Sequence, residues 1–487
     1  MSIKKKATQG SIWMSITRTG INVVDFLVYA YLARILTLEE FGLAGFCFLF
    51  VEFTNTLVNA GVNQNLVQRK EWTDRYAAST MTFVAFMGLM ASGVLVGIGA
   101  PIAYYNYSEL AALVIISLAP ITLITSLQVV VTGKLLREFK NKQMGVAKFC
   151  ATLVSAASII ALAELGYGIW ALIVGKLINV SLQYLFLVFV SKIKLSFNID
   201  KDNFKELVTF CLPLFWMVLL RFLNKKASNL FTGIVLGPVN FALLAAAHKA
   251  EVVINQVTMS SINSMVVPSF SRVGQDADVG ALFIRLVAIT SVIVTPIFMG
   301  LAAIADPFVT IAFGDKFAPS AVYMTISAFS IFPLVIANFM PNLLISKAHT
   351  KAAFNITLVN IISNVVVAAC TIWFGVSIML ICIVIGNFLA MPIRFAIVKK
   401  HIYIDTNRLI LALMPSFLSA LGMFLVVMFA KSYVSRFLDN DILTLIALVA
   451  LGGATYIVLS FLLFYPQTIK QVQELKSMFL KKKRSNA

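Results

Sequence analysis

Apolar segments long enough to cross a lipid bilayer recur along the whole chain. A hydrocarbon core of about 30 Å requires about 20 apolar residues in a helix, and polar loops separate segments of that length from one end of the sequence to the other. The pattern predicts an all-α polytopic membrane protein with fourteen transmembrane helices. The predicted spans lie near residues 11–32, 41–62, 78–100, 110–132, 144–163, 168–190, 207–236, 241–264, 286–304, 321–344, 352–373, 377–396, 409–430 and 442–464.

The composition agrees with this pattern. Hydrophobic residues make up 60% of the 487 residues, charged residues make up only 12%, and the mean hydropathy is +0.91. A soluble protein carries about twice that charged fraction. No polar stretch between the predicted spans is long enough for a soluble domain.

The formal net charge of +18 follows the predicted topology. Lys and Arg concentrate near both ends of the chain and in every second loop, whereas the opposite loops contain only Arg34, Lys316, Lys431 and Arg436. Basic loops of membrane proteins stay in the cytoplasm, where they also face anionic lipid. We therefore expect both termini in the cytoplasm. The positive charge needs no nucleic acid partner to explain it.

A smaller set of charges lies inside the predicted spans. Each ionised side chain costs about 2.5–3.5 kcal/mol at the centre of a membrane helix on insertion scales. Arg394 is close enough to the expected cytosolic end of its span to extend its side chain to the interface. Arg18 is a weaker case of the same kind, whereas Arg221, Lys225 and Lys249 need water or a partner inside the membrane. The set comprises the bases Arg18, Lys176, Arg221, Lys225, Lys226, Lys249 and Arg394 and the acids Asp25, Glu52 and Glu251.

Four of the predicted spans have a polar face. Residues three or four positions apart share one side of a helix, and polar residues recur at this spacing. Such faces line a water-filled cavity or pair with each other, because contact with lipid is unfavourable. The groups are Arg18, Asn22 and Asp25; Glu52, Asn55 and Asn59; Arg221, Lys225 and Asn229; and His248, Glu251 and Asn255, with Lys249 beside the last group.

Two interpretations of these faces remain open. In the first, ion pairs and hydrogen bonds between helices only fix the packing. In the second, the bases outnumber the acids because a wet cavity holds an anion. A lipid diphosphate or an acidic glycan would suit, since Arg and Lys bind phosphate. Asp25, Glu52, His248 and Glu251 are candidates for ion or proton coupling, because each can titrate or ligate a cation.

The chain also contains a weak internal repeat. "ILTLEEFGL" (residues 35–43) aligns with "VLGPVNFAL" (235–243) at an offset of 200. Six spans separate the two copies, which predicts parallel halves related by an axis along the membrane normal. The expected domains are an N-terminal six-helix bundle over residues 1–200, a second six-helix bundle over 201–400, and two extra transmembrane helices with a basic cytoplasmic tail over 401–487.

Five loop motifs occur in register along the chain. They are "LARILTLEEFG" after the first span, "QRKE" at the end of the second, "KLLREFKNKQMG" between the fourth and fifth, "VPSFSRV" after the eighth and "FGDKFAPS" before the tenth. In their order and spacing, these motifs resemble those of the Wzx-type polysaccharide (O-antigen) exporters, which belong to the multidrug/oligosaccharidyl-lipid/polysaccharide flippase superfamily.

The resemblance implies two six-helix bundles in a V around a central cavity, with two further C-terminal helices. It implies a flippase of the bacterial cytoplasmic membrane that moves an undecaprenyl-diphosphate-linked oligosaccharide by alternating access, driven by a cation gradient. The expected partners are this substrate, membrane lipids and polysaccharide assembly proteins, and no cofactor or metal is expected. The residues placed to bind the substrate are Arg18, Asn22, Arg221, Lys225, Lys226 and Lys249.

Two other functions compete with this one. A drug/cation antiporter of the same superfamily would need an acidic cavity. A membrane enzyme, such as a glycan polymerase or an acyltransferase, would need a large extracytoplasmic loop with catalytic groups. The longest such loop, "ADPFVTIAFGDKFAPS", has only Asp306, Asp315 and Lys316 as charged residues. The histidines form no nucleophile–base pair, and no P-loop is present, so we expect no enzymatic activity.

Overall fold

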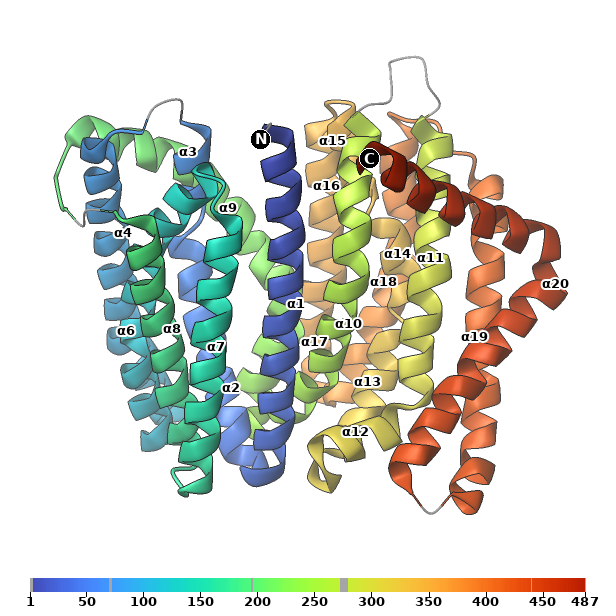
Figure 1. The fold of residues 1–487 in the computed structure, drawn as a ribbon. Coiled ribbons are helices and arrows are strands. Elements are labelled where there is room, and N and C mark those ends of the chain that lie inside the picture. Colours follow the sequence, from blue (N-terminus) through green and yellow to red (C-terminus); the bar gives the residue numbers. More distant parts are fainter. Residues whose placement is uncertain (1–2, 70–71, 194–195, 272–278, 439, 487) are drawn as a thin grey trace. The chain divides into compact units, whose positions relative to one another are not determined.

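The computed structural model describes residues 3–69, 72–193, 196–271, 279–438 and 440–486. Within these ranges every regular element is a helix (Figure 1). Eleven helical segments are long and apolar enough to cross a membrane, or twelve if a pair bent by 44°, Ser320–Ala328 with Ile331–Ser346, is one span. The predicted all-helical, multi-pass architecture is therefore confirmed. The last two residues of the motif "VPSFSRV" lie outside the described ranges.

The helices of the first half of the chain include two short π-helical turns, η1 and η2. Their bounds are α1 (Ile3–Ile35), α2 (Leu38–Val58), α3 (Val62–Gln68), α4 (Asp74–Val94), η1 (Leu95–Gly99), α5 (Ala100–Asn106), α6 (Glu109–Arg137), α7 (Asn141–Glu164), α8 (Ile169–Ser191), α9 (Lys201–Phe231) and η2 (Thr232–Leu236).

The helices of the second half include a third π-helical turn, η4, and two 3-10 turns, η3 and η5. Their bounds are α10 (Gly237–Ser271), α11 (Val279–Ala303), α12 (Ala305–Phe313), η3 (Asp315–Phe317), α13 (Ser320–Ala328), α14 (Ile331–Ala337), α15 (Met340–Ser346), α16 (Thr350–Ile361), η4 (Ile362–Val366), α17 (Val367–Thr371), η5 (Ile372–Phe374), α18 (Val376–Lys399), α19 (Thr406–Phe437) and α20 (Asp441–Asn486).

The number of candidate spans differs from fourteen for two reasons. First, α1 is not among them, because polar residues such as Arg18 and Asp25 lower its hydropathy. Second, α9, η2 and α10 follow one another directly, so residues Lys201–Gln256 count as a single helical segment of 56 residues, although the backbone at Gly237 is not helical. The sequence pattern had divided this segment into the spans 207–236 and 241–264.

The chain forms two compact units, Met1–Ala242 and Leu243–Ala487. In the first unit, α7 packs on α1 and α8, α6 packs on α4 and α8, and α9 packs on α2, α3 and α4. In the second unit, α11, α19 and α20 pack against one another (Figure 1). The predicted domains, two bundles over residues 1–200 and 201–400 and a C-terminal part over 401–487, were based on the internal repeat. They stay a prediction.

Local sequence signals set the ends of the second predicted span. Thr37 and Glu40 form a capping box at the start of α2, in which Thr37 Oγ1 accepts the Glu40 N–H at 3.2 Å and the Glu40 carboxylate accepts the Thr37 N–H at 3.1 Å. Gly61 separates α2 from α3 with a φ of 84°, a left-handed conformation that glycine adopts without strain. A Cβ atom there would lie 2.8 Å from Leu214 of α9. The span is therefore broken where it meets α9.

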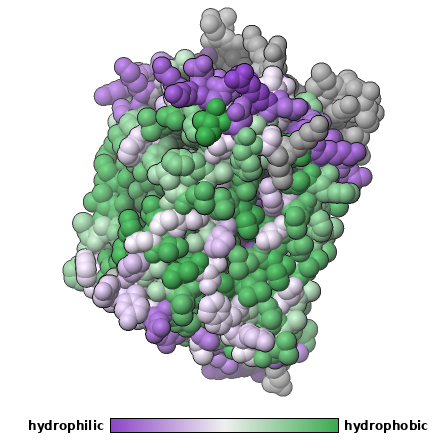
Figure 2. Space-filling model, turned by 90° about the vertical axis from the view of Figure 1, so that its left-hand side faces the viewer, coloured by the Kyte–Doolittle hydropathy of each residue, from purple (hydrophilic) through white to green (hydrophobic). Residues whose placement is uncertain are grey.

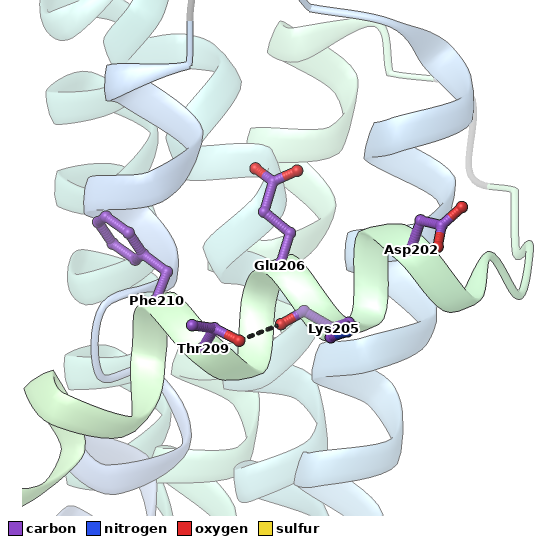
Figure 3. A pocket seen from close by; sticks show the side chains of 5 residues that line it. All are labelled: Asp202, Lys205, Glu206, Thr209 and Phe210. Carbon is purple, nitrogen blue, oxygen red and sulfur yellow. Dashed lines mark hydrogen bonds between the residues drawn. The ribbon is translucent and has the colours of Figure 1, made fainter.

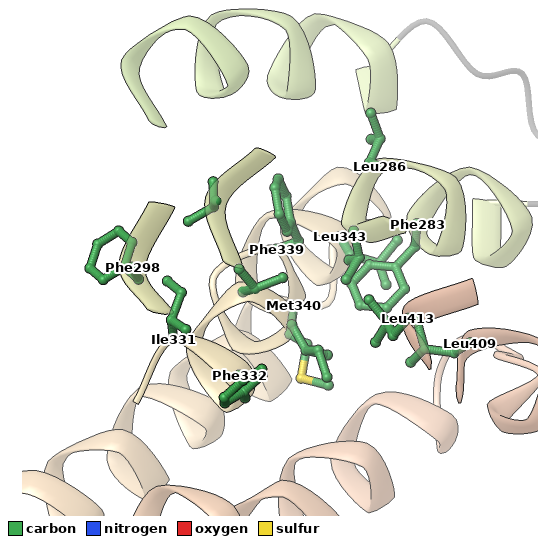
Figure 4. Close-up of a cluster of buried hydrophobic side chains, with 14 of the residues drawn as sticks. Phe283, Leu286, Phe298, Ile331, Phe332, Phe339, Met340, Leu343, Leu409 and Leu413 are labelled. Atoms are coloured by element: carbon green, nitrogen blue, oxygen red, sulfur yellow. The ribbon is translucent and has the colours of Figure 1, made fainter. Parts of the chain in front are cut away.

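Each unit has its own apolar core and an apolar surface. The largest core cluster of the second unit gathers Phe283, Phe298, Phe339 and neighbouring residues from α11, α14, α15 and α19 (Figure 4). The face shown in Figure 2 has a broad hydrophobic band between hydrophilic ends. Exposed apolar side chains of this kind contact lipid in a membrane protein.

Candidate functional site

The polar and apolar residues of α1 occupy different sides of the helix. Thr17 and Gly20 face α7, since a Cβ atom on Gly20 would lie 3.1 Å from Phe149 and Thr17 packs on Gly145. Ile16, Val23 and Leu27 form an exposed apolar side. Arg18 and Asp25 are exposed and Asn22 is half-buried on a separate polar side. A membrane helix with two exposed sides of opposite polarity turns the apolar one to lipid and the polar one to water.

A row of exposed residues follows α9 over most of its length. Its members recur at intervals of four: Lys205, Thr209, Pro213, Met217, Arg221 and Lys225. The row includes two apolar residues, and it winds around the helix by about 40° per step at 3.6 residues per turn. Arg221 lies against Met217 of the same row, with 3.9 Å between the guanidinium nitrogen and the sulfur atom. Arg221 and Lys225, two of the three cations predicted for this span, are therefore on its accessible surface.

Lys226 differs from its neighbours because it forms an ion pair. Its Nζ donates to Glu52 Oε2 at 2.9 Å and so joins α9 to α2. Both side chains remain partly accessible, at 33% for Lys226 and 52% for Glu52. The structure thus brings together one predicted binding residue and one predicted coupling residue. This ion pair between helices is of the kind that the first interpretation, contacts that fix the packing, predicts.

Three of the other predicted binding residues have no carboxylate partner in the described part of the chain. Among the residues that the structure describes, no acid lies within ion-pair distance of Arg18, Arg221 or Lys225. A second base, Lys148 of α7, interacts electrostatically with Arg18. The exposed part of these helices in the first unit is therefore rich in uncompensated positive charge.

The predicted residues of α10 belong to the second unit. His248 and Lys249 are half-buried, and each has an interaction partner. One carboxylate oxygen of Glu251, Oε1, is buried and accepts no hydrogen bond within the described part of the chain. An unsatisfied buried carboxylate oxygen is unfavourable, which makes Glu251 the coupling candidate with the most unusual surroundings.

Sequence reasoning identified Asn55 but missed the other members of a polar network inside the first unit. Thr125 of α6 donates to Asn55 Oδ1 of α2 at 2.5 Å. One turn further along α6, Gln128 donates to Gln183 of α8 at 3.3 Å, and Gln183 donates to Asn179 at 2.6 Å. The signal was available, because these residues also recur three or four positions apart on apolar spans. They are uncharged, so they did not stand out.

The prediction for Arg394 was wrong. Its side chain is 1% exposed and does not reach the interface. The guanidinium donates to Asn387 Oδ1 at 2.9 Å, to the Asn387 carbonyl at 3.2 Å and to Ser363 Oγ in the π-helical turn η4 at 3.2 Å. Neutral oxygens on α18 and η4 therefore solvate this cation inside the second unit, and this arrangement replaces extension to water.

A second unpredicted cluster lies where α3 and α9 meet. Arg69 Nη1 donates to both carboxylate oxygens of Glu206, at 2.6 and 2.7 Å, and its guanidinium lies 3.5 Å from the centre of the Tyr76 ring. Tyr76 in turn donates to Asn65 Oδ1 at 2.5 Å. Partial burial alone would lower the pKa of Arg69, but the hydrogen bonds to Glu206 and Tyr76 outweigh it and raise the pKa. The cluster fixes the carboxylate of Glu206.

Comparison with known proteins identifies the family. Residues 31–322, more than half of the chain, match the family described as "Polysaccharide biosynthesis protein". The chain belongs to this family. The succinoglycan biosynthesis transport protein ExoT of Rhizobium meliloti is 24% identical over 323 residues, which are 64% of this chain and 64% of ExoT. The lipopolysaccharide biosynthesis protein WzxC of Escherichia coli is 23% identical over 73% of each chain.

The fold has a solved counterpart. The lipid II flippase MurJ, in an inward closed conformation, superposes with a TM-score of 0.76 at 14% sequence identity, covering 93% of this chain and 99% of that chain. At this identity the likeness shows the fold alone. Together with the family match, these similarities confirm the resemblance to Wzx-type exporters that the loop motifs indicated. No group of three His, Cys, Asp or Glu side chains suited to a metal ion occurs in the described part of this family member.

Proposed function

We propose that the protein is a flippase that moves an undecaprenyl-diphosphate-linked oligosaccharide across the bacterial cytoplasmic membrane. The observation that carries this proposal is the exposed, uncompensated positive charge of Arg18, Arg221 and Lys225 on helices of the membrane region. A cation in that position is tolerated if it faces water and attracts an anion. The names of ExoT and WzxC, a transport protein and a lipopolysaccharide biosynthesis protein, favour a glycan cargo.

The topology of the proposal has fourteen spans. Twelve candidate segments become fourteen if α1 is added and if Lys201–Gln256 is divided at Gly237, whose φ of 82° interrupts the helix. Two six-helix bundles, predicted over residues 1–200 and 201–400, would form a V around a central cavity. Both termini lie in the cytoplasm in this proposal, because the basic loops then stay on that side.

The substrate would bind through its diphosphate. Phosphate oxygens accept charge-assisted hydrogen bonds from Arg and Lys, so we assign this role to Arg18, Arg221, Lys225, Lys226 and Lys249, with Asn22 as a neutral donor. The isoprenoid tail would remain in lipid while the head group enters the cavity. Rocking of the two halves would then expose the head group to the other side.

A cation gradient would supply the energy. Asp25, Glu52, His248 and Glu251 are the proposed coupling groups, and two of them have distinct surroundings. Glu52 is held by Lys226, so binding of an anion to Lys226 would release the carboxylate. Glu251 has an oxygen without a hydrogen-bond donor among the described residues, and a proton or metal cation would satisfy it. Polysaccharide assembly proteins stay a predicted partner.

The proposed activity is transport without catalysis. An antiporter for cationic drugs would be less compatible with the charge of α1 and α9, because exposed Arg and Lys repel a cationic cargo. Asp306 lies in α12, between α11 and α13, and Lys431 donates to its carboxylate. This ion pair occupies one of the few acids that a glycan polymerase or acyltransferase could use there.

The test is a flipping assay in liposomes with a defined undecaprenyl-diphosphate oligosaccharide. Arg221→Ala and Lys225→Ala should each reduce the rate by about ten- to a hundredfold, because one charge-assisted contact to phosphate contributes about 1.5–3 kcal/mol. Arg436→Ala, which removes an exposed cation near the end of α19, should leave the rate unchanged. Equal rates in all three variants would refute the anion-binding role of α9.

A further inference from the structure

The first part of α9 carries a pocket that the proposed diphosphate site does not use. Its volume is about 550 Å³, within the range of about 300–1,000 Å³ that small-ligand sites occupy. Five residues line it, and all of them lie within the first three turns of α9: Asp202, Lys205, Glu206, Thr209 and Phe210. Glu206 and Phe210 rise from the same side of the helix in Figure 3.

The polar groups of this pocket can both accept and donate hydrogen bonds. Asp202 and Lys205 are exposed and form no ion pair within the described residues. Thr209 donates its hydroxyl proton to the Lys205 carbonyl at 2.8 Å, the dashed line of Figure 3. Its oxygen therefore remains an acceptor, while the ammonium of Lys205 offers three donors. Sugar hydroxyls need this mixture, because each of them donates and accepts.

Two of the groups are held rigidly. Glu206 is fixed by the bidentate contact to Arg69, which uses only part of the acceptor capacity of a carboxylate. Phe210 packs against the apolar cluster around Val62, Leu66 and Leu207, and its ring remains partly accessible. An immobile aromatic ring presents a flat apolar surface on which the apolar face of a pyranose can lie.

The charge of the pocket argues against a diphosphate. Arg69 neutralises Glu206, and Lys205 offsets Asp202, so the local charge is close to zero. Two carboxylates would also repel phosphate oxygens. Arg221, by contrast, lies about 24 Å further along α9 than Lys205 at 1.5 Å per residue. The two positions thus suit two parts of one elongated ligand.

We infer that this pocket is a saccharide-binding site, in which Phe210 stacks on a neutral sugar ring and Asp202, Lys205 and Glu206 bind its hydroxyl groups. The inference rests on the proposed function in one respect, namely that the sugar belongs to the lipid-linked substrate. The pocket then holds the glycan while Arg221 and Lys225 hold the diphosphate. It selects substrates by their sugar and contributes little to the binding of the bare lipid.

Two measurements on the purified full-length protein test the inference. The first is the binding of methyl glycosides of glucose, galactose, mannose and N-acetylglucosamine in nanodiscs. The second is the flipping of undecaprenyl diphosphate with and without a single attached hexose. Phe210→Ala should weaken glycoside binding by about tenfold, as expected for loss of an aromatic contact together with its buried area. Phe210→Trp should retain binding, because the ring is kept.

Matched variants separate binding from folding. Asp202→Asn should weaken glycoside binding severalfold, whereas Asp74→Asn, in the first turn of α4, should not. Phe86→Ala, an exposed phenylalanine of α4, is the control for Phe210→Ala. Flipping of the bare lipid should be unchanged in the pocket variants. The inference is overturned if no glycoside binds the wild type, or if Phe210→Ala and Asp202→Asn affect both lipids equally.

The outcomes distinguish this inference from the proposed function. If the wild type binds a glycoside but moves neither lipid, the transport function fails and the sugar site stands. If the wild type moves both lipids with rates that the pocket variants do not change, transport stands and the sugar site fails.

Discussion

Arg221 in the first unit and Arg394 in the second are both arginines of apolar helices, but their surroundings are opposite. Arg221 is exposed, and its guanidinium lies against the sulfur of Met217. Arg394 is 1% exposed and donates to three oxygens of Asn387 and Ser363. The first has donors left for a ligand, whereas most donors of the second are used within the protein. A charged residue in a predicted span therefore indicates a ligand-binding site only where the protein itself does not supply its hydrogen-bond partners.

The difference has a physical reason. Desolvation of a guanidinium is expensive, so a buried one needs compensating acceptors. Ser363 lies in the π-helical turn η4, and Asn387 also donates to Asn364 at 2.9 Å. The π-turn and α18 thus supply a ready-made shell of neutral oxygens. Within the described ranges no comparable shell of oxygens surrounds Arg221, as expected for a side chain in water.

The largest expected effect is on stability at Arg394. Arg394→Ala should lower the free energy of unfolding by about 3 kcal/mol, because Asn387 and Ser363 lose their donor and a cavity remains. Thermal unfolding in detergent measures this change. Arg436→Ala, at an exposed position, should shift the midpoint very little. A midpoint for Arg394→Ala equal to that of the control would contradict a structural role.

Charge-preserving substitutions sharpen the comparison. Lysine keeps the charge but not the planar fork of donors, so Arg394→Lys should cost about 1–3 kcal/mol of stability because acceptors are left unmatched. Arg221→Lys should leave stability within about 0.5 kcal/mol and retain most of the flipping rate, since a phosphate accepts either cation. Loss of transport without loss of stability in Arg221→Lys would mean that the fork geometry itself is required there.

The smallest expected effect concerns the ion pair between Glu52 and Lys226. Both side chains are partly exposed, so a double-mutant cycle with Glu52→Gln and Lys226→Met should give a coupling energy of about 0.5 kcal/mol. Raising the salt concentration should reduce it further. A coupling energy of several kcal/mol would mean that the pair stabilises the fold, as Arg394 does. It would weaken the assignment of the pair to substrate and ion binding.

The apolar spacing of the chain was sufficient to predict a helical membrane protein, and the loop motifs were sufficient for its family. The polar faces of α1 and α9 were also visible as residues three and four positions apart. The pairing of Glu52 with Lys226 was not, because the two residues are on helices far apart in sequence. The pocket on α9 escaped notice as well, since Asp202, Lys205 and Glu206 resemble an ordinary solvated helix start.

The sequence alone determined which segments are apolar enough to leave water, and therefore the helical class. It also determined which charged residues lie inside apolar helices. Helical periodicity is a local property, so residue spacing is enough to establish it. Only the tertiary structure decided which of these charged residues find hydrogen-bond partners inside the protein. Arg394 is satisfied by Asn387 and Ser363 because α18 and η4 pack together, and the oxygens that a neighbouring helix offers cannot be read from the helix that carries the charge.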